Sequence, residues 1–198
     1  MTYSITLASG SQIRRQILDG AGLQYDVKTS HVDEAAIKMS MIAMDAPPRD
    51  IADALAEAKA VKVSRDRGGL VIGADQIMVM DGHIYDKPKS MDEARERLLS
   101  MRGKPHFLIG AVVICENGQA VWRHASKTTL YVREFTEKFL DEYLRIEGDD
   151  ILHTVGAYKF EGRGAQLFSK VDGDFFSILG LSLLPLLDYL RIRGLLET

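Results

Sequence analysis

The first candidate for chemistry is the segment Leu7-Ala8-Ser9-Gly10-Ser11, which Arg14 and Arg15 follow. An apolar strand is expected to pass into a helix here, and helix N-termini offer unpaired N–H groups and a partial positive charge to anions. Cations are disfavoured in a first helical turn, so the two arginines are unfavourable there unless an anion such as a phosphate is bound. The alternative is a pair of solvated arginines on a surface helix.

The second candidate is Asp75, which follows the apolar run Val71-Ile72-Gly73-Ala74. The sequence predicts that this carboxylate lies at the end of a strand, and ligands of α/β proteins gather beyond the carboxyl ends of strands. A carboxylate in that position can bind a divalent metal or orient an attacking water. The alternative is an aspartate that only caps a turn.

Two lysines and an acidic pair could serve the same chemistry. Pro88 holds Lys87 in an extended conformation, in which the ammonium could meet a phosphate as a point charge. Lys59 lies in a predicted helix, where a lysine is more often solvated. Asp33 and Glu34 are adjacent acids in a predicted loop, where they could supply oxygen ligands to Mg²⁺ or Mn²⁺ or act as surface or capping acids.

The glycine-rich segment 156–164 contains Glu161 between aromatic and glycine neighbours. It could be a loop that reads a nucleotide base, or a strand with bulges. The sequence contains no Walker A motif, no dinucleotide-binding fingerprint and no serine nucleophile elbow. The histidines show no metal-ligand spacing.

An α/β fold is expected to position these residues. The evidence is that short apolar strands alternate with helices along the chain. The hairpin signals Asp81-Gly82 and Asn117-Gly118 favour a mixed sheet over a purely parallel one. The expected strands are 4–8, 25–29, 70–73, 76–80, 83–85, 107–115 and a stretch ending at 132. The expected helices are 12–21, 51–63, a helix capped by Ser90 that ends at 101, one capped by Thr136, and 182–192.

Composition narrows the classes of function. The chain has 198 residues and a net charge of −3, which favours one domain without a broad nucleic-acid-binding face. The single cysteine excludes an intrachain disulfide. With no long apolar run and no signal peptide, we expect a cytoplasmic protein that binds neither membrane nor nucleic acid.

Taken in order, the motifs resemble the Maf family of nucleoside triphosphate pyrophosphatases over nearly the whole chain. The matching segments are Leu7-Ala8-Ser9-Gly10-Ser11 with Arg14-Arg15, Val32-Asp33-Glu34, Ala58-Lys59-Ala60, Gly73-Ala74-Asp75, Asp81-Gly82, Lys87-Pro88, Gly156-Ala157-Tyr158, Glu161-Gly162, Gly164, Gly173-Asp174 and Gly180-Leu181. The resemblance implies a single domain over residues 1–198. Its fold would be related to that of the inosine triphosphate pyrophosphatases, a mixed twisted sheet with flanking helices and two lobes around a cleft.

The resemblance also implies roles for single residues. Asp75 would accept a proton from the attacking water. Ser9, Arg14, Lys59 and Lys87 would hold the triphosphate of a nucleotide substrate. Asp33 or Glu34 would help to place a divalent cation, Mg²⁺ or Mn²⁺. A homodimer is one possible assembly.

Three positions separate the branches of the family by substrate. Gln76 and Glu161 are similar to the branch that cleaves 7-methyl-GTP, whereas Ile13 matches neither that branch nor the one that cleaves dTTP and UTP. The sequence therefore favours a modified nucleotide such as 7-methyl-GTP, with a dTTP/UTP pyrophosphatase as the alternative. A second alternative is a nucleotide-binding regulator of septation with little turnover.

Overall fold

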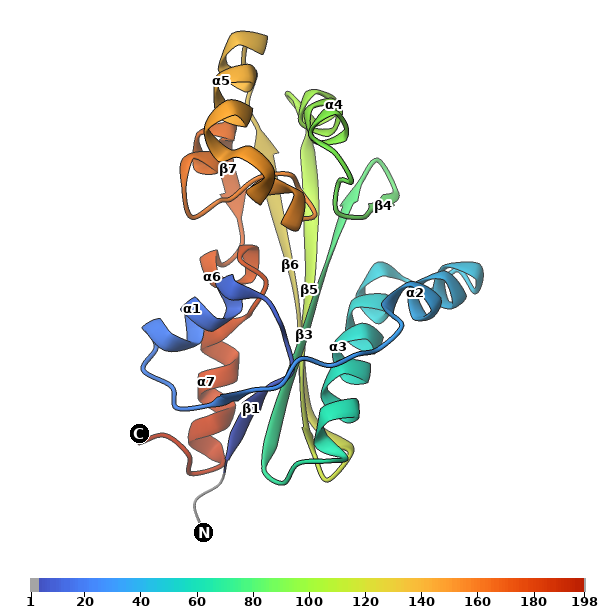
Figure 1. Cartoon of the computed structure of the whole chain (residues 1–198), viewed down its shortest axis with the longest axis vertical. Helices are drawn as coiled ribbons and strands as arrows, with labels where there is room; N and C mark the ends of the chain where they lie inside the picture. The colour runs from blue at the N-terminus through green and yellow to red at the C-terminus, as the bar shows by residue number, and fades with distance from the viewer. Residues whose placement is uncertain (1–3, 198) are drawn as a thin grey trace. The chain divides into compact units, whose positions relative to one another are not determined.

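The computed structural model of the chain describes residues 4–197. Helices and strands alternate along these residues, as Figure 1 shows. The strands are β1 (Ile5–Leu7), β2 (Asp26–Val27), β3 (Leu70–Met80), β4 (His83–Tyr85), β5 (Pro105–Glu116), β6 (Gln119–Val132) and β7 (Phe168–Asp172). The α-helices are α1 (Gln12–Gly20), α2 (Glu34–Ala43), α3 (Pro48–Ser64), α4 (Met91–Met101), α5 (Glu137–Glu147), α6 (Phe175–Ile178) and α7 (Leu183–Ile192), with 3₁₀ helices η1 (Gly148–His153) and η2 (Arg163–Leu167).

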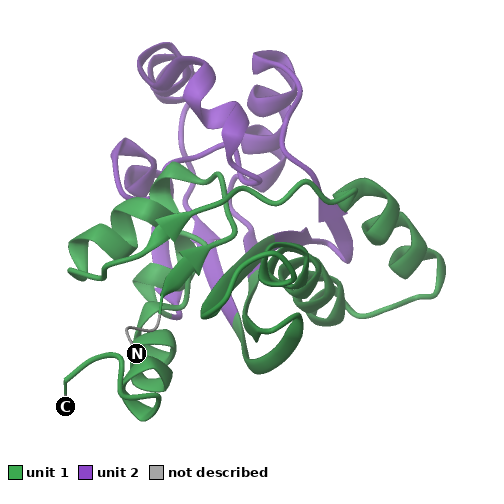
Figure 2. Cartoon of the chain, turned by 60° about the horizontal axis from the view of Figure 1, so that its bottom comes forward, with its two compact units in different colours: residues 1–76, 109–126, 174–198 green, residues 77–108, 127–173 purple. Residues whose placement is uncertain are grey.

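The chain divides into two compact units, coloured separately in Figure 2. Unit 1 comprises residues 4–76, 109–126 and 174–197 of the described chain, and unit 2 comprises residues 77–108 and 127–173. The strands β3, β5 and β6 each contribute residues to both units. Two compact units agree with the expectation of two lobes. The prediction of a single domain over residues 1–198 stays a prediction.

One sheet contains all seven of these strands, in the order β2-β1-β3-β5-β6-β7, with β4 beside β3. β1 runs parallel to both β2 and β3, whereas the pairs β3/β4 and β6/β7 are antiparallel. The expectation of an α/β fold with a mixed sheet is therefore confirmed.

In unit 1, helices cover both faces of the sheet. Ile72 and Ala74 of β3 pack in one apolar cluster with Leu7 of β1, Leu18 of α1 and Leu186 of α7. The neighbouring residues of β3 point to the opposite face, because side chains alternate along a strand. That second face is covered by α3, whose Ala56 and Ala60 lie close to Gly73.

In unit 2, the helices α4 and α5 and the 3₁₀ helix η1 contact one another. A buried aromatic group lies beside β5 and β7, where the rings of His106, Tyr158 and Phe168 are 4.8–5.9 Å apart between centroids. His106 and Tyr158 also share a hydrogen bond of 2.8 Å between Nε2 and Oη. This cluster fixes the start of the glycine-rich segment.

Two local expectations and one of the open alternatives were wrong. The region after Asp33 is the helix α2, because Asp33 caps it and helix-forming residues follow. Asp75 lies inside one continuous strand β3, because burial by α3 extends the strand past Gly73. The segment 156–164 contains turns and the start of η2, so it is not a strand with bulges.

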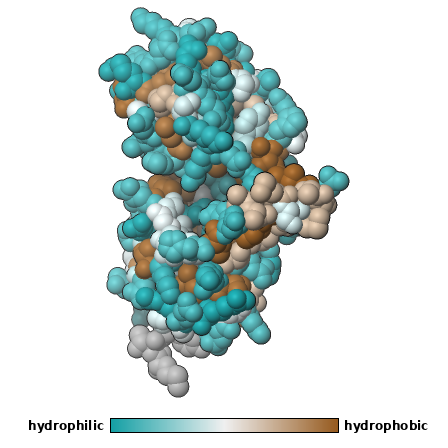
Figure 3. All heavy atoms as spheres, turned by 45° about the vertical axis from the view of Figure 1, so that its right-hand side comes forward, coloured by the Kyte–Doolittle hydropathy of each residue, from teal (hydrophilic) through white to brown (hydrophobic). Residues whose placement is uncertain are grey.

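The helix α2 carries apolar side chains on its exposed surface. Met39, Ile42 and Met44, just past its end, are each exposed, and Figure 3 shows apolar atoms gathered over this part of unit 1. Among residues 4–197, no helix is long and apolar enough to cross a membrane.

Candidate active site

The close packing of β3 against α3 brings together two of the predicted site residues. Gly73 and Asp75 lie two residues apart on β3 and face the same side of the sheet. A Cβ at position 73 would lie only 2.1 Å from the carbonyl oxygen of Ala56 on α3. Glycine at position 73 therefore lets α3 approach the strand. Lys59 lies three residues after Ala56, about one helical turn further along α3, and from there it reaches Asp75.

Lys59 forms ion pairs with two carboxylates. Its Nζ lies 2.6 Å from Asp75 Oδ1 and 2.8 Å from Glu34 Oε2. Lys59 is 7% exposed and Asp75 8% exposed, whereas the Glu34 side chain is 51% exposed. Because two buried charges are stable only as partners, each holds the other in place. The alternatives of a solvated Lys59 and of a turn-capping Asp75 are therefore wrong.

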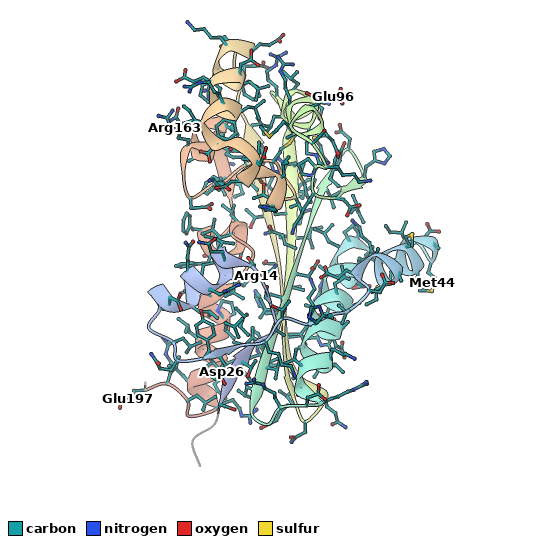
Figure 4. All side chains as sticks on the ribbon, viewed as in Figure 1. Arg14, Asp26, Met44, Glu96, Arg163 and Glu197 are labelled. Carbon is teal, nitrogen blue, oxygen red and sulfur yellow. The ribbon has the colours of Figure 1, made fainter. Side chains whose placement is uncertain are left out.

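Arg14 and Ser9 form a second part of the site. Arg14 Nη1 donates to Ser9 Oγ at 3.1 Å, and Nε donates to the Gly180 carbonyl at 2.9 Å. Burial lowers the pKa of the Arg14 guanidinium, and the carboxylates of Asp75 and Glu34 act in the opposite direction. Arg14, labelled in Figure 4, is thus electrostatically coupled to the Lys59 group.

The two adjacent arginines have different surroundings. Arg15 Nη2 donates to the Gly10 carbonyl at 2.9 Å, so the guanidinium bonds back across the start of α1. Ser11 caps α1 by accepting a hydrogen bond from the backbone N–H of Arg14. The alternative of two solvated arginines is wrong for Arg14, because its side chain bonds to Ser9 and Gly180 instead of extending into water.

Two of the three predicted specificity residues also lie in unit 1. Gln76 Nε2 donates to the carbonyls of Ser177 and Ile178 on α6, at 2.8 and 3.2 Å. The amide nitrogen thus anchors α6, which leaves the amide oxygen of Gln76 for other interactions. Ile13 packs against the apolar core of unit 1.

Lys87 and Glu161 lie in unit 2. Lys87 is exposed and follows β4, with the buried Pro88 after it. Glu161 is exposed in a turn just before η2, and its charge contributes to a raised pKa of Tyr143, whose main cause is burial. Both side chains are accessible to a ligand.

The two acidic candidates for metal binding differ in their contacts. Asp33 Oδ1 accepts the backbone N–H of Ala36 at 2.9 Å and so caps α2, whereas Glu34 pairs with Lys59. No group of three or more His, Cys, Asp or Glu within residues 4–197 could hold a metal ion. Mg²⁺ is commonly held by one or two carboxylates together with substrate phosphates, so Glu34 and Asp75 fit such a cation as part of its ligand set.

Sequence reasoning missed the contribution of α6 and the turn after it. The carbonyls of Ser177, Ile178 and Gly180 hold Gln76 and Arg14, which are over 100 residues away in sequence. Gly180 has φ +92°, a conformation that favours glycine. The Gly180-Leu181 motif gave its position, but nothing local showed that its carbonyl accepts from an arginine.

The arrangement in unit 1 suits phosphoryl chemistry. Arg14 and Lys59 are cations that can meet phosphate oxygens, and the ion pair of Asp75 uses Oδ1, so Oδ2 can accept a proton. Phosphoryl transfer depends mainly on positioning and on neutralisation of charge, and these are what buried, paired cations and carboxylates supply.

Comparison with known proteins agrees with this geometry. The profile of a family described as "Maf-like protein" matches residues 4–193. The chain is 50% identical over 192 residues to a "Nucleoside triphosphate pyrophosphatase" of Caulobacter vibrioides, covering 97% of this chain and 96% of the relative. It is 48% identical over 198 residues to a protein of the same name from Hyphomonas neptunium, covering all of both chains.

A third relative carries a narrower name. The chain is 44% identical over 194 residues to a "7-methyl-GTP pyrophosphatase" of Rhizobium meliloti, with 98% of each chain covered. The profile match and these identities, together with the ordered motifs and the Lys59–Asp75 pair, show that the chain belongs to the Maf family.

Proposed function

We propose that this chain hydrolyses a nucleoside triphosphate to the nucleoside monophosphate and pyrophosphate. The observation that carries the proposal is the ion pair of Lys59 with Asp75 and Glu34 inside unit 1, electrostatically coupled to Arg14. The names of the relatives support the same reaction. The reaction breaks the anhydride bond between the α- and β-phosphates, and water supplies the new oxygen and the protons.

Asp75 accepts a proton from the attacking water in this proposal. Its ion pair with Lys59 fixes Oδ1, so the direction of the second oxygen is set before substrate binds. A positioned base contributes about 10²–10⁴-fold to a rate. Lys59 therefore acts twice, by holding Asp75 and by offering positive charge to the phosphates.

The triphosphate is bound by Ser9, Arg14, Lys59 and Lys87 in this proposal. Arg14 is already held by Ser9 and Gly180, so little side-chain entropy is lost when it meets a phosphate. Lys87 is exposed and held extended by Pro88, which suits a cation that reaches toward an anionic ligand.

Glu34 and Asp75 would hold a divalent cation, Mg²⁺ or Mn²⁺, together with phosphate oxygens. When bound, such a cation neutralises negative charge on the phosphates. Glu34 suits this role better than Asp33, because Asp33 already caps α2. The half-exposed Glu34 carboxylate can exchange its contact with Lys59 at low cost.

The test is pyrophosphate release from a panel of nucleoside triphosphates, with Mg²⁺ or Mn²⁺ and with excess chelator. We expect pyrophosphate and monophosphate in equal amounts and a loss of turnover in chelator. Release of single orthophosphates, or full turnover in chelator, would contradict the proposal. Nucleotide binding without any turnover would favour the alternative of a septation regulator.

Within this reaction, we propose that the preferred base is a modified purine such as 7-methylguanine, and that Glu161 reads it. An ionised carboxylate only accepts hydrogen bonds, and guanine offers two neighbouring donors, N1–H and the N2 amine. Methylation at N7 makes the ring cationic, which attracts a carboxylate further. The name of the Rhizobium meliloti relative supports this choice.

The base preference is tested by kcat/KM for 7-methyl-GTP, GTP, dTTP and UTP on the wild type and on Glu161→Gln. Once a bound base covers Glu161, an acceptor left unpaired there costs about 1–3 kcal/mol, so we expect roughly a 5–150-fold preference for 7-methyl-GTP that Glu161→Gln reduces. Glu96→Gln, an exposed glutamate of α4 labelled in Figure 4, is the matched control and should keep the ranking. A wild type that prefers dTTP or UTP would favour the pyrimidine alternative.

A further inference from the structure

Arg97 is a charged residue on the buried side of a helix. The buried residues of α4 are Ala94, Arg97, Leu98 and Met101, a spacing typical of the apolar stripe of a helix. Arg97 is only 7% exposed, and its burial lowers the pKa of the guanidinium. An apolar side chain of similar length would avoid this desolvation, so stability alone does not explain an arginine here.

The guanidinium of Arg97 joins two segments that are far apart in sequence. Nη1 donates to the carbonyl of Asp86 and, at 2.6 Å, to the carbonyl of Val155. Nη2 donates to Glu93 Oε1 at 2.8 Å, and the ring of Tyr85 lies 5.3 Å from the guanidinium carbon. All of these residues belong to unit 2.

The same ion pair holds the backbone on both sides of Lys87. Arg97 binds the carbonyl of Asp86, and the other carboxylate oxygen of Glu93 accepts the backbone N–H of Lys89 at 2.8 Å. Pro88 between them is buried and conformationally fixed. The position of Lys87 is therefore set by α4 rather than by contacts of its own side chain.

The second segment held by Arg97 begins the loop that carries Glu161. Val155 precedes Gly156 and Ala157, and Ala157 has φ +57°, which is unusual for a residue with a side chain. Such a conformation persists only where the surroundings hold it. The hydrogen bond to the Val155 carbonyl is one of the contacts that do so.

We propose that Arg97 is a positioning residue. Through its hydrogen bonds to the carbonyls of Asp86 and Val155, it places Lys87 and the start of the Glu161 loop so that both can contact the same nucleotide. The inference rests on the proposed function, in which Lys87 binds the triphosphate. A planar guanidinium suits this role, because it presents several donors in a fixed geometry that an ammonium cannot reproduce.

The test compares Arg97→Met with Arg95→Met. Arg95 lies two residues earlier on α4, and its ion pairs with Glu137 and Asp141 touch neither segment. We expect Arg97→Met to raise KM for the nucleotide about 10- to 100-fold with a smaller change in kcat, since small displacements of binding groups can cost about 10²-fold. Arg95→Met should stay within about 2-fold, and Arg97→Lys should recover part of the loss.

A double-mutant cycle separates positioning from general support of the fold. Binding of inorganic tripolyphosphate, which has no base, is measured by calorimetry for Arg97→Met in the wild-type and Lys87→Ala backgrounds. We expect at least about a 10-fold loss of affinity in the first background and less than about 2-fold in the second, because coupled residues are not additive. Equal losses in both backgrounds, or no loss, would overturn the inference.

Two further outcomes keep the inference separate from the proposed function. If Arg97→Met does not fold, Glu93→Gln replaces it in the same cycle. A loss of tripolyphosphate affinity that is present in the wild-type background and absent in the Lys87→Ala background supports the inference. An equal loss in both backgrounds overturns it. A wild type that binds tripolyphosphate in an Arg97-dependent way but releases no pyrophosphate would refute the function and support the positioning. A wild type that binds no tripolyphosphate would overturn the positioning inference, whereas the proposed function is judged by pyrophosphate release alone.

Discussion

Replacing Asp75 with asparagine tests the central assignment with the smallest change of shape. The asparagine side chain is isosteric, and its amide oxygen can still accept a hydrogen bond from Lys59. What the variant loses is the negative charge and the ability to take a proton. Turnover should therefore fall by about 10²–10⁴-fold, the usual contribution of a positioned base.

The structure also sets the expected cost to stability and to binding. Lys59 keeps its ion pair with Glu34 at 2.8 Å, so the variant does not leave an unpaired buried charge. We expect a loss of about 1.5–3 kcal/mol in the free energy of unfolding, as for a hydrogen bond to a charged group. Measured without a divalent cation, triphosphate affinity should stay the same or increase, because a carboxylate that acts on Arg14 is removed.

The assay measures pyrophosphate release and, separately, nucleotide affinity by calorimetry. Asp81→Asn is the control, because Asp81 lies at the hairpin turn between β3 and β4. Its carboxylate forms an ion pair of 3.2 Å with the exposed Lys104, which also belongs to unit 2. Its φ of +50° is tolerated by asparagine. An Asp75→Asn protein with near wild-type turnover, or an equal loss in a folded Asp81→Asn, would refute the assignment.

Two further substitutions test how the fold supports the site. Gly73→Ala places a methyl group 2.1 Å from the Ala56 carbonyl oxygen, so α3 must shift. We expect the free energy of unfolding, measured in urea, to fall by about 1–3 kcal/mol and turnover to decrease. Gly68→Ala is the control and should have no effect, because the space around Gly68 is open. Burial lowers the pKa of His106 to about 4, below its ordinary 6.5, so the unfolded chain binds the proton more strongly and stability falls as the pH drops from 6.5 toward 4. Between pH 7 and pH 4, the free energy of unfolding of His106→Gln should fall by up to about 3 kcal/mol less than that of the wild type. An equal fall in both proteins would show that His106 does not cause this pH dependence.

Elements with strong local signals were predicted well. Ser11, Ser90 and Thr136 each accept a backbone N–H three residues ahead and cap the predicted helices. Asp81-Gly82 forms the predicted hairpin turn. These features depend on residues only a few positions apart, which is why sequence alone is sufficient.

Features that depend on tertiary packing were not predicted. The polar and glycine residues 73–76 looked like the end of a strand, but α3 and α6 cover them, so β3 continues to Met80. The pairing of Lys59 with Asp75 needs the register of α3 on the sheet. The bond from Arg14 to Gly180 joins residues 166 positions apart. Of these packing features, only the burial of Arg97 could have been predicted from the sequence, because Arg97 is an arginine within the apolar stripe of a predicted helix.

The charges of unit 1 bear on why such a site would need a metal ion and further cations. Arg14 and Lys59 carry two positive charges, and Asp75 and Glu34 carry two negative charges, so this coupled group is close to neutral. A triphosphate brings several negative charges and cannot be stabilised by a neutral group in a partly buried place. The extra positive charge must come from other sources, which under the proposed function are Lys87 and a divalent cation. Under the proposed function, the two carboxylates of this group therefore create the need for the cation, and the same two carboxylates are suited to hold it.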